Sequence, residues 1–448
     1  MAAVMLAMAG GCASKTTSDA TTISIWTGDS HSKACVSQLV ADWNKTTGKE
    51  KGIYIDYQVK EGSQNDIIEM AIASKTEPVL FTCTDTKKYS EAGYIEALED
   101  MPGGAEFAAT YDKSDMTEGT HTWQGKTYKV PFYITTFGLV YNKDMFKKYG
   151  IVDENGEAKP PVTWAEMVED AKKITDVQNK IYGIALPMKW GGYWDWDFSK
   201  PVFSATGKYT YDRTADKYDY ELYRKPLEYL LQIKEDKSFY PGPEGLDNDP
   251  ARAQFAEGLV GMMFAASWDV SVLTNQFPAK CDWGVAPIPV IDEADLGKYY
   301  YESTDECSFD VSSKAAAKDP AKIAEVFKFF NSTEVVTKLY EEGCIIPYRS
   351  ECIENANAVK DIKGWAEFGE IATKSKAVQG WVTLKIEGDS DNDALAKVWF
   401  GTLSIDDFIN GRNEIWNSAY QKGLAEGTID RLAEFKDKDS ELFVREIK

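Results

Sequence analysis

The sequence predicts an α/β fold divided into two domains. Strand-like and helix-like segments alternate along its first third, which is typical of a layered fold with a parallel sheet. The chain has 448 residues, more than a single hydrophobic core usually holds. Hydrophobic residues make up 43% of it and charged residues 27%. This ordinary globular composition excludes a disordered, collagen-like or polytopic membrane chain.

The first five elements follow in the order strand, helix, strand, helix, strand. Residues 21–30 alternate around the β-branched Ile23 and Ile25 and end near Gly28, so they predict a strand that runs into a loop. Apolar residues at helical spacing predict the first helix over residues 33–46. The next strand, helix and strand are predicted at residues 52–60, 66–74 and 77–84.

Helix starts are marked further along the chain. Thr163 is followed three residues later by Glu166, which predicts a capping box. Asp249 and Asp319 each precede a proline, so each is predicted to cap a helix that begins there. Apolar stripes predict further helices over residues 321–330 and 405–420, and helix dominates after about residue 340.

Three proline-containing segments suggest where the chain passes between the domains: residues 130–136, 285–290 and 340–349. Proline fixes φ and lacks an N–H donor, so such segments suit connections rather than central strands. We therefore expect one α/β lobe to comprise residues 22–130 and 291–342. The other lobe, mainly helical, is expected to comprise residues 131–290 and 343–448.

Charge and residue counts exclude several kinds of site. The formal net charge is −22, so a phosphate backbone would repel the chain and no nucleic acid is expected as a partner. The chain has two histidines, His31 and His121, which excludes a His-rich metal site. No C-x-x-C occurs among the seven cysteines, so no zinc ribbon is indicated. We expect no metal and no cofactor.

The N-terminus resembles the end of a lipoprotein signal peptide. Residues 1–11 are apolar and small, Cys12 follows, and a polar stretch leads to the first strand. We expect residues 1–11 to be a signal-peptide remnant and residues 12–21 a flexible spacer lipidated on Cys12. An apolar N-terminus with a chance cysteine is the alternative.

The six other cysteines form up to three disulfides or stay buried thiols. No other apolar run spans a membrane, so only the lipid would contact it.

A set of segments in fixed order resembles the bacterial extracellular solute-binding proteins of family 1, the sugar receptors of ABC importers. The specific part is the run of YNKDMF (141–146), TWAEM (163–167) and FAEGLVGMM (255–263), and WGVAPIPV (283–290) is among the segments that complete the match. The resemblance implies a periplasmic-binding-protein-like (Venus flytrap) fold, in which two α/β lobes close by a hinge on a solute in a central cleft. It also implies a receptor without catalytic residues that delivers a carbohydrate, expected to be an oligosaccharide, to the permease subunits. An extracytoplasmic monomer held at the cell membrane by its lipid is expected.

The aromatic and acidic segment 190–198 is the first candidate binding segment. Sugars present apolar C–H faces and hydroxyl groups, so a sugar cleft combines flat aromatic rings with carboxylates. Four residues here fit that chemistry and are candidates: Trp190, Trp194, Asp195 and Trp196. The alternation Trp-Asp-Trp-Asp also fits a half-buried strand, in which one of the tryptophans belongs to the core.

Other candidates lie at the ends of strands or near the expected crossings. The resemblance places Trp268 against the sugar ring, whereas Asp269 either binds the solute or caps the next helix. Open α/β sheets bind ligands at the carboxyl ends of their strands, which points to three residues: Trp26, Asp29 and Asp85. Burial under the first helix is the alternative for Trp26. Tyr133 and Arg349, near two crossings, complete the candidates.

Two other functions remain open. A secreted glycoside hydrolase would also combine aromatics and carboxylates, but it needs a carboxylate pair across the scissile bond, and the sequence singles out none. A receptor of the same fold for a polyamine would use acidic residues among aromatics through charge pairing and cation–π contacts. Polyamine binding would depend strongly on salt, whereas sugar binding would not.

Overall fold

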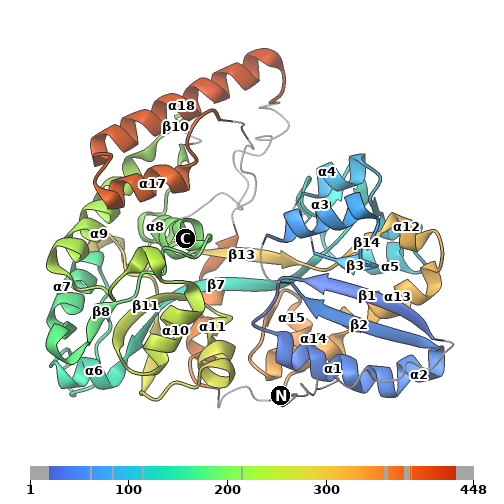
Figure 1. The fold of residues 1–448 in the computed structure, drawn as a ribbon, viewed down its shortest axis with the longest axis horizontal. Helices are drawn as coiled ribbons and strands as arrows, with labels where there is room; N and C mark the ends of the chain where they lie inside the picture. The colour runs from blue at the N-terminus through green and yellow to red at the C-terminus, as the bar shows by residue number, and fades with distance from the viewer. Residues whose placement is uncertain are drawn as a thin grey trace, which may run out of the picture. The chain divides into compact units, whose positions relative to one another are not determined.

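The computed structural model describes residues 20–429 except 61–62, 83–84, 114–115, 213–214, 358–361, 378–383 and 385. Cys12 and Cys83 therefore lie outside the described residues. The chain divides into two compact units, each built from discontinuous segments (Figure 1). Unit 1 is Met1–Tyr111, Thr122–Lys129 and Phe309–Phe330, and unit 2 is Asp112–His121, Val130–Ser308 and Asn331–Lys448. Both units contain strands and helices, which confirms the predicted α/β class.

Unit 1 is built around a five-stranded sheet in the order β2-β1-β3-β14-β4. Strand β1 runs parallel to β2 and β3, and β14 is antiparallel to β3 and β4. The predicted order strand, helix, strand, helix, strand and its parallel pairing are thus confirmed. The elements of this unit are β1 (Thr21–Thr27), α1 (Lys33–Lys45), α2 (Thr47–Lys51), β2 (Ile53–Val59), α3 (Gln64–Ser74), β3 (Leu80–Phe81), α4 (Thr86–Glu91), β4 (Ile95–Glu96), α5 (Gly104–Ala108), β5 (Thr122–Trp123), β6 (Lys126–Thr127), β14 (Asp310–Ser312), α12 (Ser313–Ala316) and α13 (Pro320–Phe330).

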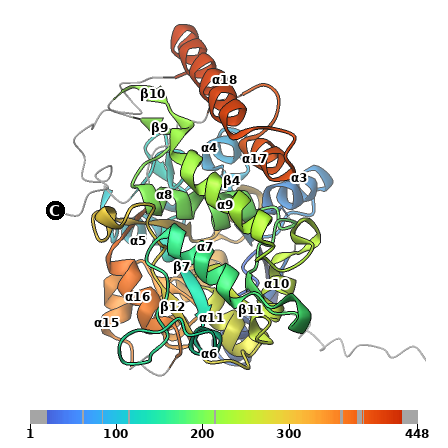
Figure 2. The ribbon, with the colours of Figure 1, turned by 90° about the vertical axis from the view of Figure 1, so that its left-hand side faces the viewer.

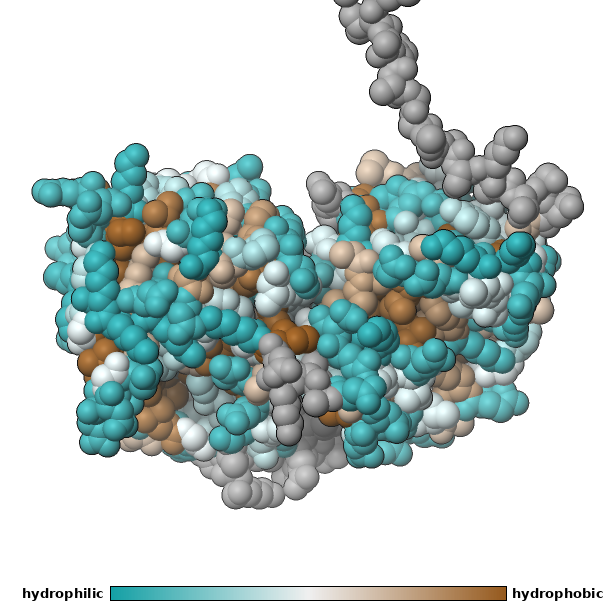
Figure 3. Space-filling view, turned by 90° about the horizontal axis from the view of Figure 1, so that it is seen from below, coloured by the Kyte–Doolittle hydropathy of each residue, from teal (hydrophilic) through white to brown (hydrophobic). Residues whose placement is uncertain are grey.

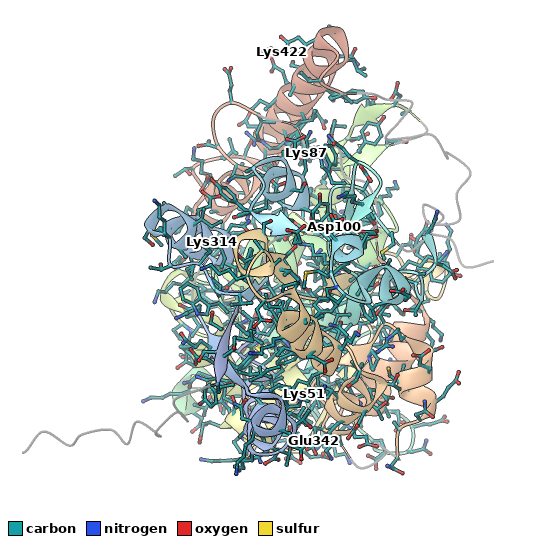
Figure 4. All side chains as sticks on the ribbon, turned by 90° about the vertical axis from the view of Figure 1, so that its right-hand side faces the viewer. Lys51, Lys87, Asp100, Lys314, Glu342 and Lys422 are labelled. Carbon is teal, nitrogen blue, oxygen red and sulfur yellow. The ribbon has the colours of Figure 1, made fainter. Side chains whose placement is uncertain are left out.

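Ion pairs at the surface of unit 1 join elements that are distant in sequence. The Lys314 ammonium of α12 lies 2.8 Å from Glu77, which precedes β3, and Lys51 of α2 pairs with Glu325 of α13. Both lysines are labelled in Figure 4. Exposed pairs of this kind add little to stability, so the apolar faces of the sheet and helices hold the unit together.

Unit 2 is built around a seven-stranded sheet whose centre is the long strand β7. The first half of β7 pairs with β13 and β15, and its second half pairs with β11 and β12. The elements of this unit are β7 (Pro131–Asn142), α6 (Lys143–Lys148), α7 (Trp164–Ile174), β8 (Tyr182–Ile184), α8 (Lys200–Thr206), β9 (Tyr211–Asp212), β10 (Lys217–Tyr218), α9 (Arg224–Asp236), α10 (Asn248–Ala256), β11 (Val260–Ala266), α11 (Asp269–Ser271), β12 (Trp283–Ala286), β13 (Tyr301–Cys307), α14 (Thr333–Glu341), β15 (Ile346–Pro347), α15 (Ser350–Glu354), α16 (Trp365–Thr373), β16 (Ser375–Ala377), α17 (Asp391–Phe400) and α18 (Ile405–Glu426).

Helices α7 and α9 pack side by side, and α7 lies against strands β8 and β11 of this sheet (Figure 2). The capping box predicted at Thr163 is confirmed, because its hydroxyl accepts the Glu166 N–H at 3.1 Å and the Glu166 carboxylate accepts the Thr163 N–H at 3.3 Å. This cap starts α7, which buries Trp164 and Met167 in the core of unit 2.

Two local predictions were wrong. The prediction that residues 130–136 form only a connection fails, because β7 continues through them to Asn142. Pro131 is the first residue of the strand, where a missing N–H costs little. Asp249 is not a cap, since α10 begins at Asn248 and Asp247 caps it.

Charged and polar side chains cover most of the face of each unit that is seen in Figure 3, and the hydrophobic patches are scattered among them. Within the residues that the structure describes, no helix is both long and apolar enough to cross a membrane. Among the described cysteines, Cys281 and Cys352 are free thiols.

Candidate functional site

Three aromatic rings of unit 2 form a corner at the end of strand β11, and we call Phe137, Trp196 and Trp268 the aromatic corner. The ring centroids of Trp196 and Trp268 lie 5.3 Å apart with the ring planes tilted by 51°. Phe137 of β7 lies 5.7 Å from Trp196. Trp196 and Trp268 are half-buried and pack on the core of unit 2. The corner therefore keeps part of its aromatic surface open to a ligand.

The position of Trp268 follows from the turn that ends β11. Every residue of β11 is buried, and Trp268 occupies the N-cap position of the short helix α11. The next residue, Asp269, is 3% exposed, and its Oδ2 atom accepts the Ala266 N–H at 2.8 Å. This hydrogen bond closes the turn around Ser267 and Trp268 and fixes the backbone that carries the indole ring.

A buried arginine completes the support of this turn. The Arg252 Nη2 atom of α10 lies 2.6 Å from Asp269 Oδ1, and its Nη1 atom donates to Asp249 Oδ1 at 2.9 Å. Arg252 is 9% exposed. A buried charge needs a partner of opposite charge, so Arg252 and Asp269 hold each other in place directly after Trp268.

Asp197 adds a carboxyl group whose ionisation is disfavoured. Burial raises the pKa of Asp197 well above its usual 3.8, and the nearby charge of Asp269 raises it further, although Arg252 opposes this. A carboxyl group in this state donates a hydrogen bond as well as accepting one. It can therefore serve a hydroxyl-bearing ligand or a buried polar neighbour.

The segment that carries Trp196 is a π-helical turn, Tyr193–Ser199. The alternative of a half-buried strand for this segment was wrong. Trp194 is 7% exposed and packs edge-on against Tyr193 and Phe198, so it belongs to the core. Trp190 is half-buried, and Asp195 is exposed. Of the four candidates in this segment, the structure joins Trp196 to Trp268 and leaves the others outside the corner.

Tyr133 and Arg349 lie at the other half of strand β7. Tyr133 is 4% exposed, and β15 pairs Pro347 opposite it. Arg349 donates to the Asn331 carbonyl at 2.7 Å and to Glu351 at 3.0 Å. Tyr133 is thus held by the backbone pairing of β7 with β15, and the Arg349 side chain ties α15 to Asn331. Ligand binding by either stays a prediction.

Three candidates belong to unit 1, at the carboxyl ends of β1 and β3. Trp26 is half-buried, and the Lys60 ammonium lies 4.2 Å from its ring centroid. Asp29 lies close enough to Tyr57 that, after burial, its charge is the next cause of the raised pKa of that phenol. Asp85 is exposed and caps α4 by accepting the Lys88 N–H at 2.9 Å. Because β1 and β3 are parallel neighbours, these residues share one edge of the sheet.

Three residues in or next to the aromatic corner were not predicted from the sequence: Phe137, Lys200 and Arg252. Arg252 had a readable signal, because it falls on the buried stripe of α10 together with Ala251 and Phe255. A charged residue at a core position of an amphipathic helix indicates a buried partner. Lys200 begins α8 four residues after Trp196, a spacing that places the two on one helical face.

Comparison with known proteins points to one class. A model of the family described as bacterial extracellular solute-binding protein matches residues 32–336. The maltotriose-binding protein of Pyrococcus abyssi is 28% identical over 257 residues, which are 56% of this chain and 49% of that protein. The sn-glycerol-3-phosphate-binding periplasmic protein of Brucella abortus is 24% identical over 338 residues, which are 69% of this chain and 71% of that protein.

Solved structures share the fold. The GacH receptor of Streptomyces glaucescens, solved without ligand and with acarbose, superposes with a TM-score of 0.67 at 20% identity, covering 91% of this chain and 99% of that one. A chitin oligosaccharide binding protein superposes with a TM-score of 0.68 at 18% identity, covering 90% and 99%.

Proposed function

The chain belongs to the bacterial extracellular solute-binding proteins, and from this membership we propose that it is the receptor of an ABC importer for a carbohydrate. The observation that carries the proposal is the contact between Trp196 and Trp268, whose half-buried rings lie 5.3 Å apart. Aromatic rings pack on the apolar C–H faces of sugars while polar groups beside them meet the hydroxyls. Relatives and structural neighbours whose names include maltotriose and chitin oligosaccharide support this ligand class.

We assign Trp196 and Trp268 the role of sugar platform. Asp269 acts through its bonds to Ala266 and Arg252, which support the platform from below the surface. Trp26, Asp29 and Asp85 at the edge of the unit 1 sheet, together with Trp190, Trp194, Asp195, Tyr133 and Arg349, remain further candidates for ligand contact. Ligand-driven closure by a hinge stays a prediction of the sequence.

The family is extracellular. Beyond that, we propose that a lipid on Cys12 anchors the chain to the cell membrane, that it acts as a monomer, and that it delivers its solute to permease subunits without chemical change. Replacing Cys12 by serine should release the protein into the medium or periplasm. Retention of that variant in the membrane fraction would contradict the anchor.

The function is tested by thermal shift of the full chain against mono- and oligosaccharides, with spermidine and putrescine in the same panel. A ligand at 100 times its dissociation constant adds about 2.7 kcal/mol of apparent stability, which gives a clear rise in melting temperature. A rise with one class of sugar supports the proposal. A rise with polyamines alone, or release of reducing sugar from the oligosaccharides, would overturn it.

A further inference from the structure

Lys200 places a positive charge at the aromatic corner. Its ammonium lies 5.0 Å from the ring centroid of Trp196 and 5.7 Å from that of Phe137. Both distances are within the range of a cation–π contact. Lys200 is half-buried as the first residue of α8, so its charge is held beside Trp196, one of the two rings that we assign to the ligand.

Among the described residues, Lys200 forms no ion pair, whereas the other buried cation at the corner, Arg252, pairs with both Asp249 and Asp269. Asp197, on the same segment, has its pKa raised by burial and then by Asp269, which reduces the negative charge that it contributes. Asp195 is exposed to water, where its charge is well screened.

The rest of the molecule does not supply a general attraction for anions. The chain carries a net charge of −22, so its overall field repels an anionic solute. A preference for such a solute must come from a local cation at the site. An ammonium at hydrogen-bonding distance from a carboxylate or phosphate makes a charge-assisted bond that is about twice as strong as a neutral one.

We propose that Lys200 is a specificity-determining residue, which makes the aromatic corner select a sugar or polyol that carries an anionic group over its neutral counterpart and over a polyamine. The inference rests on the proposed function, because it assumes that the solute lies on Trp196 and Trp268. Two sources supply the required chemistry, the carboxylate of a uronic acid and a phosphate ester. Both offer oxygens to the ammonium while the ring or carbon chain packs on the indoles.

Calorimetric titration of the full chain with matched ligand pairs tests this selection. The first pair is an oligogalacturonate and the galacto-oligosaccharide of equal length, and the second is glycerol 3-phosphate and glycerol. At least one anionic member should bind ten times more tightly than its neutral partner, and the pair that shows the difference identifies the source of the charge. Spermidine should not bind.

Variants at Lys200 distinguish an effect on ligand selectivity from an effect on folding. Lys200→Met keeps the aliphatic stem on the rings and should remove the tenfold difference between the anionic and the neutral member of the pair. Lys200→Arg should retain the difference. Lys208→Met, on an exposed lysine after α8, is the matched control and should behave like the unmodified chain.

The outcomes distinguish the two proposals. Neutral sugars that bind as tightly as their anionic counterparts would overturn the role of Lys200 and leave the carbohydrate receptor standing. A Lys200→Met variant that has a lower melting temperature but the same preference for anionic ligands would also overturn the role of Lys200. Binding of spermidine, with no response to any sugar or polyol, would overturn both.

Discussion

The guanidinium of Arg252 and the carboxylate of Asp269 lie 2.6 Å apart inside unit 2, at the turn that carries Trp268. Both side chains are almost fully buried, with 11% and 5% of their surface exposed. Asp269 also accepts the Ala266 N–H, so one carboxylate ties the end of β11 to helix α10. The platform of the candidate site thus depends on a buried charge pair that the ligand is not expected to touch.

Asp269→Asn should destabilise the chain strongly. The amide still accepts a hydrogen bond from Ala266 but leaves the buried Arg252 with only the half-exposed Asp249 as a charge partner, and breaking a buried pair costs about 3–5 kcal/mol. Denaturant unfolding followed by circular dichroism should show this loss. Asp195→Asn, at an exposed position of the neighbouring segment, is the control and should change stability by less than about 0.5 kcal/mol. A loss of equal size in both variants would contradict the structural role of the pair.

Trp268→Ala should weaken carbohydrate binding at least tenfold, which is about 1.4 kcal/mol of binding free energy. The ring is only half-buried, so the variant should still unfold cooperatively. Titration with the sugar that raises the melting temperature most would measure the affinity. Trp123→Ala, in the β5–β6 hairpin of unit 1, serves as the control and should keep the original affinity. An unchanged affinity in the Trp268 variant would remove this residue from the site.

The sequence predicts local structure well where the signal is local. The periodicities of β1, α1, β2 and α3 and the capping box at Thr163 depend on neighbouring residues, and each is present in the structure. Strand β7 could not be predicted in the same way, because its pairing partners β11, β12 and β13 lie more than 100 residues away along the chain. Pro131 suggested an interruption of the strand, because the sequence does not show that it is the first residue of β7.

The candidate site also depends on contacts between distant elements, which local sequence patterns do not show. The alternation in Trp194-Asp195-Trp196-Asp197 fits a strand by its period of two, yet the segment folds as a π-helical turn that sends Trp194 into the core and Trp196 to Trp268. Composition therefore singles out the segment that carries Trp196, whereas the choice between its tryptophans depends on tertiary packing. The support from Arg252 depends on a contact between two elements and has no motif of its own.

The stability of unit 2 should decrease between about pH 4 and pH 6 through Asp170 of α7. Burial, and then the nearby charge of Glu166, raises the pKa of Asp170 from its usual 3.8 to about 6. The folded chain therefore binds a proton here that the unfolded chain has lost. This contribution is fully present below about pH 4 and is lost as the pH rises through 6.

Asp170→Asn removes that titration and should make the chain more stable than the original at pH 7.5 but not at pH 3.5. The gain should be about 1–2 kcal/mol, because the partial exposure of the group to solvent reduces the value that the pKa shift alone implies. Urea unfolding at several pH values measures the difference. Glu235→Gln, exposed on α9, is the control. A stability difference for Asp170→Asn that does not vary with pH would contradict the shift.

A second buried pair, Lys129 and Asp310, should stabilise unit 1 only while both partners are present. The Lys129 ammonium lies 3.2 Å from Asp310, and the two side chains are 1% and 0% exposed. Asp310→Leu leaves a buried ammonium without this carboxylate and should cost about 3–5 kcal/mol, whereas the double variant Lys129→Met with Asp310→Leu should recover most of the loss. The exposed pair of Lys126 with Asp100 is the control; Asp100 is labelled in Figure 4.

Asp100→Asn should lower the free energy of unfolding by less than about 1 kcal/mol, because water already solvates both charges of the exposed Lys126–Asp100 pair. Denaturant unfolding of the four chains gives a double-mutant cycle for the buried pair. If the double variant is as unstable as the sum of the two single variants, the two side chains do not interact, and the stability of this part of unit 1 comes from the apolar contacts of β14 and α13. Recovery in the double variant shows instead that the cost of Asp310→Leu is the unmatched charge of Lys129.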